Sequence, residues 1–403
     1  MDKIRATYQI FPRRTAPFWT WLTGCPAPGE TARGAPGPFG FFAWSLVSYL
    51  GGLALALAAG AARGGAAVAG TLLGWCLVVH GARRLVSTVA HQCIHGRFSG
   101  RRRVDHFIGE LVTLLTFTQT AEEYRKEHFM MHHKRGIFTT PADPAAQFLH
   151  DVGFRPGRDS RALWRQLLLN IGSPWFHGYF FWGRLRSNLI AARPVRKLCA
   201  WLHVLAWATA IAVGVVTAKT FVLAVAVPVV CLYQLSVLFE FISEHAWFVP
   251  YPADSRARAI HGTHSWGRFC GSAVPQLAGA HGSRLRWCGQ WLAWVAAHLC
   301  YHLPVRILVL PGDLPQHDFH HRRPNTRDWT QATHARQSDL EWVAAGDSDE
   351  APYLHFWGLH LAITHVLDGI ARATPQPALD PAFLSPGILD GEDGQRSASR
   401  PSS

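Results

Sequence analysis

The hydrophobic pattern of the chain begins with two apolar runs joined by a short turn. Residues 39–62 are uncharged and apolar, which is long enough to span a bilayer as a helix. A turn at Arg63 leads into a second run, 66–81. This run is short for a full crossing, but it is completed if Arg83 and Arg84 reach up to the lipid headgroups. We therefore expect a helical hairpin that returns the chain to the side on which it begins.

Two further runs, 198–218 and 221–242, repeat this arrangement around Lys219. Two other stretches are less apolar. Residues 104–120 carry Asp105, His106 and Glu110 in their first half, and residues 287–310 are interrupted by polar side chains and a proline. We expect both to lie at the membrane interface or to dip into it. A full crossing by 287–310 would carry the residues that follow it to the opposite side.

The pattern therefore predicts an all-α integral membrane protein with about four transmembrane helices, interfacial helices and a cytosolic, histidine-rich cap. We divide the chain into a cytosolic N-terminal leader (1–38), a membrane domain (39–372) and a tail (373–403). The tail is rich in proline, serine and glycine, so we expect it to be disordered. Most arginines fall in the segments placed on the starting side, as the positive-inside rule requires of a cytosolic face.

Composition and charge support the same class. Hydrophobic residues make up 49% of the 403 residues and charged residues only 16%, which is apolar and poor in charge against the usual globular mix. The formal charge of +13 raises the question of nucleic-acid binding. The arginines, however, flank the apolar runs, so we expect them to contact the surface of the lipid bilayer. We expect no nucleic-acid partner.

Three histidine clusters supply candidate chemistry. The chain contains HQCIH, HFMMHH and HDFHH, in this order. Histidines three or four residues apart project from one side of a helix, so each cluster can present several imidazoles together. Their members are His91, His95, His128, His132, His133, His317, His320 and His321. On an α-helix, His128 and His132 would share a face and His133 would lie one step round.

The number of histidines indicates two metal ions. One octahedral ion takes about six ligands, so eight are too many for one ion and suit two. His245 follows the fourth apolar run, on the same predicted side, and is a candidate ninth ligand. Imidazole binds zinc, copper, iron and nickel, so spacing alone does not identify the metal.

Other residues have weaker claims on the metals. His298 and His302 are four residues apart but lie in an apolar run. His261, His264 and His281 fall in a loop region, where they could contact the substrate or support a ligand histidine. Isolated histidines at a membrane interface are most simply amphipathic side chains. Carboxylates often accept the second ring N–H of a ligand histidine, and Glu127, Glu244 and Asp318 each adjoin one, although surface solvation explains them equally well.

These motifs resemble those of the membrane fatty acid desaturase and hydroxylase superfamily. Its signature is three histidine boxes in this order, placed after the second span, before the third and after the fourth. The stretch Ser243-Glu244-His245 is similar to the additional histidine site of many members. The resemblance extends over about residues 40–330.

The resemblance implies a non-haem centre of two iron ions on the cytosolic side, with O2 as co-substrate. Electrons would come from an external ferredoxin-, flavodoxin- or cytochrome b5-type donor, because no fused cytochrome b5 motif is present. It implies an enzyme that introduces a double bond into an acyl chain, lipid- or carrier-bound. Arg322, Arg323 and Arg327 after the third cluster suggest an anionic handle on the substrate, or contact with lipid headgroups.

Two alternatives remain open. The first is a hydroxylase or ketolase of the same superfamily that acts on a lipid or a specialised metabolite. The second belongs to another class: a histidine-rich membrane metal transporter or sensor. Transporters usually hold their ligands within the spans, near the midplane, whereas these clusters are predicted outside them.

Overall fold

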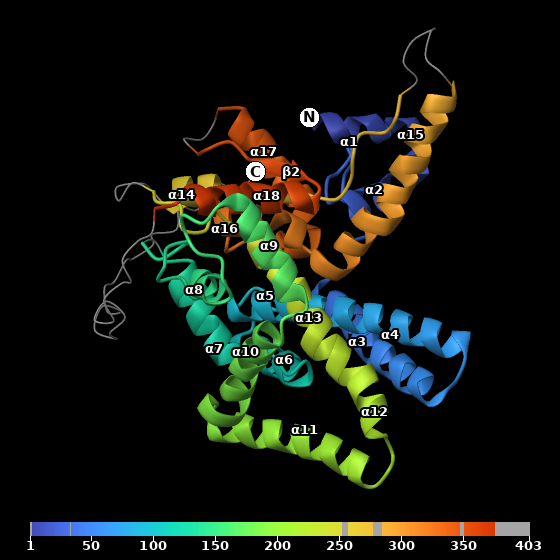
Figure 1. The fold of residues 1–403 in the computed structure, drawn as a ribbon. Coiled ribbons are helices and arrows are strands. Elements are labelled where there is room, and N and C mark those ends of the chain that lie inside the picture. The colour runs from blue at the N-terminus through green and yellow to red at the C-terminus, as the bar shows by residue number, and fades with distance from the viewer. Residues whose placement is uncertain are drawn as a thin grey trace.

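The computed structural model describes residues 2–32, 34–134, 136–251, 257–276, 284–346 and 350–374. The predicted tail, beyond Thr374, and His281 lie outside these residues. The helices are α1 (Lys3–Ala6), α2 (Ala16–Thr23), α3 (Pro38–Ala61), α4 (Gly65–Arg84), α5 (His91–Ile94), α6 (Arg102–Leu115), α7 (Ala121–Tyr124), α8 (Pro144–Asp151), α9 (Ser160–Ile171), α10 (Pro174–Leu185), α11 (Pro194–Ala212), α12 (Ala218–Phe221), α13 (Tyr233–Glu244), α14 (Ala257–His264), α15 (Arg284–Ala297), α16 (His317–Arg322), α17 (Ala332–Ala344) and α18 (Leu359–Arg372) (Figure 1).

The fold is almost entirely helical, which confirms the predicted class. Two three-residue strands, β1 (Gly267–Phe269) and β2 (His355–Trp357), pair in parallel with Gly267 opposite His355. Wider π-helical turns join several of the helices, at Leu85–Ala90, Arg125–His132, Arg186–Ala191, Val222–Leu232, His298–His302 and Val305–Val309. As a result α4 runs on into α5, and α12 runs on into α13.

Among the described residues, five helices are long and apolar enough to cross a membrane. They are Pro38–Ala61, Gly65–Ile94, Pro194–Ala212, Ala218–Glu244 and Arg284–Val309. The first four coincide with the four predicted spans. The fifth contains 287–310, for which the sequence predicts an interfacial or re-entrant helix, and that placement stays a prediction. The stretch 104–120 forms the shorter α6, which is not among the five.

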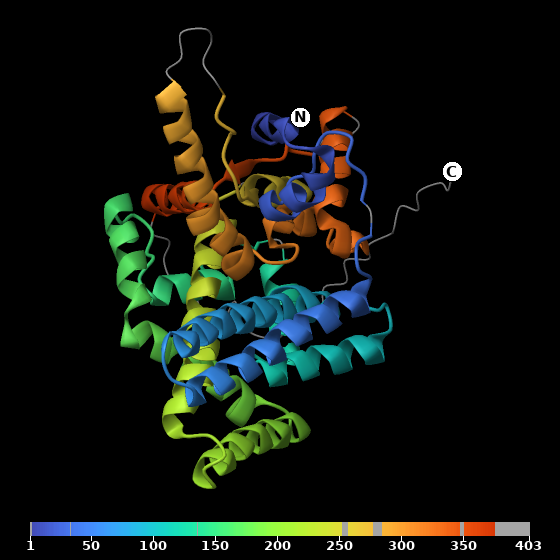
Figure 2. The same ribbon diagram turned by 90° about the vertical axis from the view of Figure 1, so that its right-hand side faces the viewer.

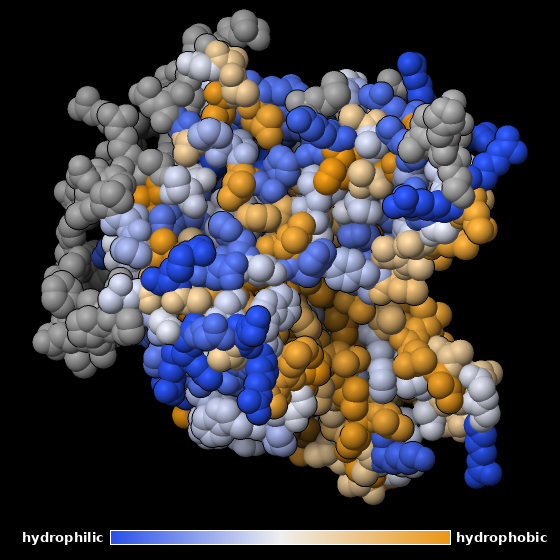
Figure 3. Space-filling model, turned by 45° about the horizontal axis from the view of Figure 1, so that its top comes forward, coloured by the Kyte–Doolittle hydropathy of each residue, from blue (hydrophilic) through white to orange (hydrophobic). Residues whose placement is uncertain are grey.

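Exposed apolar side chains mark the surface that faces lipid. Large hydrophobic side chains are exposed along α3, α4 and α11, among them Trp44, Leu72 and Trp201. In Figure 3 hydrophobic colour gathers on the lower right part of the molecule, while the upper part shows hydrophilic and hydrophobic residues mixed. Contiguous apolar surface of this extent is typical of a membrane-embedded region.

The first hairpin is packed through glycines. A Cβ at Gly81 would lie 2.4 Å from the backbone nitrogen of Tyr49, and one at Gly52 would lie 2.6 Å from that of Val78. Only glycine allows α3 and α4 to approach this closely, as is common between membrane helices. Figure 2 shows the two helices side by side and antiparallel.

The two long helices that continue beyond the hairpins are joined by an ion pair. Arg83 at the end of α4 contacts Glu240 of α13, and both side chains are buried. Pro228 lies inside the π-helical turn before α13. It has no N–H to donate, which favours a local widening of the helix. The ion pair fixes the ends of the helices that carry His91 and His245 relative to each other.

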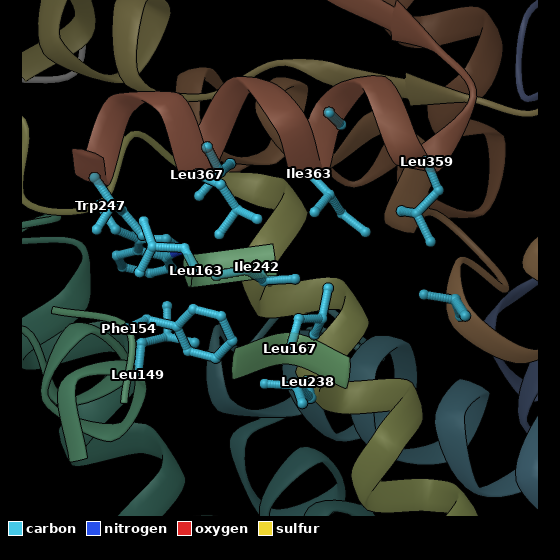
Figure 4. Close-up of a cluster of buried hydrophobic side chains, with 14 of the residues drawn as sticks. Leu149, Phe154, Leu163, Leu167, Leu238, Ile242, Trp247, Leu359, Ile363 and Leu367 are labelled. Carbon is cyan, nitrogen blue, oxygen red and sulfur yellow. The ribbon is translucent and has the colours of Figure 1, made fainter. Parts of the chain in front are cut away.

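A hydrophobic core lies between α13 and the helices α9 and α18, which are together called the cap below. Leu238 and Ile242 of α13 pack with Leu163 and Leu167 of α9 and with side chains of α18 (Figure 4). These residues are almost completely buried. Burial of a large aliphatic side chain contributes about 1.5–3 kcal/mol, so this core holds the end of α13 rigidly beneath the cap.

The N-terminal segment packs against the rest of the chain. Tyr8, Phe11 and Trp19 surround Trp294 of α15, and the Tyr8 hydroxyl lies 2.8 Å from Nε2 of His298. Figure 1 and Figure 2 both show α1 and α2 beside α15. Residues 1–38 stay predicted as cytosolic, and the structure shows that this segment contributes to the packing of 284–309.

The short helix α16, which carries three histidines, is fixed by buried charges. Asp318 accepts hydrogen bonds from Nε and Nη2 of Arg336 at 2.7–3.0 Å, and both side chains are at most 3% exposed. Arg322 donates to the carbonyl oxygens of Gly262, Ala351 and Pro352. These contacts set the orientation of α16.

We expect Arg336→Met to destabilise the protein strongly. The substitution leaves the Asp318 carboxylate buried without its partner, and breaking a buried ion pair costs about 3–5 kcal/mol. Thermal unfolding in detergent should therefore show a much lower melting temperature. Gln337→Met is the control, because Gln337 is the neighbouring residue and donates to Glu341 on the surface of the same helix. Equal melting temperatures of the two variants would contradict this role of the ion pair.

Candidate metal centre

Three segments and one residue bring the nine predicted histidines together. His91 and His95 lie in and directly after α5, His128 and His132 lie in the π-helical turn Arg125–His132, and α16 carries three more. His133 follows that turn, and His245 follows α13 in an extended conformation. These three segments and His245 converge, so residues up to 230 positions apart in the sequence contribute to one site.

The first group consists of His91, His95, His128 and His320. One nitrogen from each ring lies within 4.8 Å of one from every other ring. The closest approach is between His91 Nε2 and His320 Nε2, at 2.8 Å. His91 and His320 are buried, while His95 and His128 are partly exposed. The first cluster thus contributes both of its histidines here, and the other two clusters contribute one each.

The second group consists of His132, His245, His317 and His321. Its four rings also present nitrogens within 4.8 Å of one another, and all four are buried. Nε2 of His317 lies 3.1 Å from Nε2 of His321. His245, the candidate ninth ligand, belongs to this group, so the structure brings it together with the clusters.

His133 lies beside the first group and borders the second. Its Nε2 is 3.1 Å from Nε2 of His128 and 3.3 Å from Nε2 of His320. Its ring stacks on that of His321 with 4.5 Å between centroids. Five imidazoles therefore gather on the first side and four on the second.

The π-helical turn explains why His128 and His132 belong to different groups. The sequence predicts that they share a face, as they would on an α-helix. In the structure the His133 N–H donates to the carbonyl oxygen of His128, five residues earlier. The wider turn brings His133 next to His128 and turns His132 toward His245. π-Helical turns are frequent at functional sites for this kind of adjustment.

The donor atoms fit metal ions. Two imidazoles bound to one ion at about 2.0–2.1 Å place their nitrogens about 2.9–3.4 Å apart, and four Nε2–Nε2 distances here are 2.8–3.3 Å. Both ring nitrogens of His95 and of His245 are buried and have no hydrogen-bond partner among the described residues. Unpartnered buried nitrogens are costly unless something binds them, and a cation would satisfy them.

Burial keeps the imidazoles neutral, which is the form that binds metals. Loss of solvent, reinforced by neighbouring histidines, lowers the pKa of His128, His133 and His320 well below the usual value. Burial and nearby arginines lower the pKa of His95 to about 3. His132 differs: burial acts to lower its pKa, but the Asp143 carboxylate outweighs that effect and raises it.

Two side chains orient the ligands from behind. The Asp143 carboxylate is fully buried and lies 2.7 Å from Nδ1 of His132. The Tyr124 hydroxyl lies 3.3 Å from Nδ1 of His91. In both cases Nδ1 faces the support and Nε2 is left for the site, an arrangement common at metal centres. Neither residue is among those predicted from the sequence, because neither adjoins a histidine cluster.

The three predicted carboxylates have different partners. Asp318 pairs with Arg336 and not with a histidine. Glu127 is half-buried and bonds with the Gln119 side chain. Only Glu244 approaches a candidate ligand, with Oε2 at 3.7 Å from Nε2 of His317.

The other predicted histidines that the structure describes stay outside the two groups. His298 contacts the Tyr8 hydroxyl, His302 packs beside it, and His264 contacts the carbonyl of Val249 and the Thr263 side chain. His261 is closer, with its ring 5.3 Å from that of His321. Its pKa is lowered to about 4, mainly by burial.

A cavity of about 480 Å³ opens onto the histidines. His91, His128, His132 and His317 form one wall, and Phe148, Phe180, Val237 and Phe241 contribute apolar surface. Arg322 and Arg323 do not line it: the first binds backbone carbonyls and the second pairs with Asp339 and Glu350. These two arginines are therefore engaged by other groups, and the suggestion that Arg322, Arg323 and Arg327 contact an anionic handle or lipid headgroups stays a prediction.

A family model described as fatty acid desaturase matches residues 66–304, more than half of the chain. The match covers the first two histidine clusters and His245, and it ends before the third cluster at 317–321. No curated protein matches the chain.

We expect His320→Ala to lower the metal content of the purified protein. His320 contacts both His91 and His133, so its loss removes the ring that links the first cluster with the second. The number of metal ions per chain, measured by inductively coupled plasma mass spectrometry, should fall by about one. The protein should still insert into membranes. His106→Ala, an exposed histidine on α6, is the matched control. An unchanged metal content in His320→Ala would contradict the assignment.

Proposed function

Since the chain belongs to the fatty acid desaturase family, we propose that it is an O2-dependent membrane oxidoreductase that introduces a double bond into an acyl chain. The family implies an oxidoreductase, and the histidine groups can hold metal. The observation that carries the proposal is the pair of neighbouring four-histidine groups beside a partly apolar cavity.

We assign nine ligands to two iron ions. His91, His95, His128, His133 and His320 would hold one ion, and His132, His245, His317 and His321 the other. Bound there, the iron pair would supply the redox chemistry that activates O2. Imidazole donors suit iron among other metals, and the family membership favours iron.

The protein's own contribution is to position the substrate and to exclude water. Phe148, Phe180 and Phe241 offer an acyl chain an apolar surface next to His91, His128 and His317. Loss of water around the reacting carbons protects a strongly oxidising site from side reactions. Asp143 and Tyr124 keep two of the imidazoles in a fixed orientation, because each occupies the Nδ1 side of its ring.

The overall reaction balances with an external reductant. Desaturation removes two hydrogen atoms, that is two electrons and two protons, from adjacent carbons. Together with two electrons from the donor and two protons from the solvent they reduce O2 to two water molecules. Hydroxylation would use the same two donor electrons and two solvent protons, insert one oxygen atom into a C–H bond and release the other as water. We place the histidine groups on the cytosolic side, where a ferredoxin-, flavodoxin- or cytochrome b5-type protein can deliver the electrons.

We expect product formation to require O2, iron and an electron donor together. Membranes containing the protein should convert an acyl substrate to a product that has lost two hydrogens, detected by mass spectrometry of extracted lipids and thioesters. His106→Ala should retain this activity, and His320→Ala should lose it. Gain of one oxygen would instead identify a hydroxylase. Metal uptake into vesicles without any oxidised product would overturn the proposal in favour of a transporter.

A further inference from the structure

The carboxylate of Glu244 lies on the metal side of the second histidine group. We propose that Glu244 is itself a ligand of the second ion, so that one ion is held by imidazoles alone and the other by four imidazoles and a carboxylate. This inference rests on the proposed function for the identity of the metal, and on geometry for the position of the ligand.

Glu244 approaches Nε2 of His317 and not its Nδ1. The supporting contacts of this site are made at Nδ1: Asp143 at His132 and Tyr124 at His91. Glu244 instead lies 3.7 Å from Nε2 of His317, and this Nε2 is also the atom that lies 3.1 Å from Nε2 of His321. Glu244 therefore approaches His317 from the side on which the imidazoles of this group converge, not from behind.

The Glu244 carboxylate makes no hydrogen bond within the described part of the chain. Glu244 is only 5% exposed, and it lines the cavity together with His132 and His317. Its nearest guanidinium, that of Arg268, is 3.8 Å away and donates instead to the carbonyls of Glu240 and Leu314 and to the Ser243 hydroxyl. A buried carboxylate without a donor is costly, and a directly bound cation would offset that cost.

The distance between Glu244 Oε2 and His317 Nε2 also fits two donors bound to one ion. Two donors bound to one ion at about 2.0–2.2 Å are about 3 Å apart when adjacent and about 4 Å apart when opposite. The 3.7 Å between Glu244 and His317 falls between these limits. Glu240, one turn earlier on α13, is engaged by Arg83, so it does not compete for the same role.

A carboxylate ligand would also make the number of donors equal in the two groups. The first group gains a fifth donor from His133, whose Nε2 lies 3.1 Å from His128 and 3.3 Å from His320. The second group has four imidazoles. Glu244 raises it to five donors as well, and its negative charge makes the two positions chemically different, because an anionic oxygen donor favours the more oxidised state of its ion.

The test is metal binding and spectroscopy of Glu244→Gln in the full-length purified protein. Titration with iron(II) should show that one of two equivalents binds at least tenfold more weakly than in the wild type. Mössbauer spectra of the iron-57 protein should show one of two components altered. Glu127→Gln is the matched control, since Glu127 lines the same cavity beside His128 but bonds with Gln119. Two unchanged equivalents and unchanged spectra in Glu244→Gln would overturn the proposal.

A second variant separates a ligand from a charge that only stabilises the fold. Glu244→Asp keeps the negative charge near Arg268 but shortens the side chain by one methylene group. A ligand role predicts normal melting with the second equivalent still weakened, whereas full recovery of metal binding would show that Glu244 acts through charge alone. The same titration with zinc keeps the outcome distinct from the proposed function: if the protein binds zinc and not iron, the oxidase proposal fails and the effect of the Glu244 substitutions still decides the ligand role.

Discussion

The convergence of nine imidazoles in one largely buried space is the constraint on which this structure depends. Each ring is an apolar body with two nitrogens that need partners, and removing such groups from water without partners is costly. Here several nitrogens face one another at 2.8–3.3 Å, and others have no partner at all within the described chain. Two cations, one in each histidine group, would satisfy these nitrogens.

The scaffold holds the imidazoles in place through rigid connections between distant segments. The close glycine packing of α3 and α4, the Arg83–Glu240 ion pair and the core around Leu238 and Ile242 fix the helices that lead to His91 and His245. Asp318 and Arg336 fix α16 from the opposite side. The candidate ligands thus belong to structural elements that are themselves well anchored, which is what a metal site with exact donor positions requires.

Much of this organisation is predictable from the sequence, because it follows from local patterns. Long apolar runs predict the four hairpin helices, and the spacing of histidines predicts that the clusters meet. The division of the ligands is not predictable in this way. It depends on the π-helical turn at Arg125–His132, which no residue pattern announces, and it separates His128 from His132. Asp143 and Tyr124 reach their histidines only through the tertiary fold, and Asp318 is drawn away by Arg336, which lies 18 positions further along the chain.

Two metal ions lying side by side within these histidine groups would be visible by X-ray diffraction from crystals of the iron-loaded protein, recorded on both sides of the iron absorption edge. We expect two anomalous peaks, one among His91, His95, His128 and His320 and the other among His132, His245, His317 and His321. A single peak, or iron bound outside these two groups, would rule out a paired metal centre.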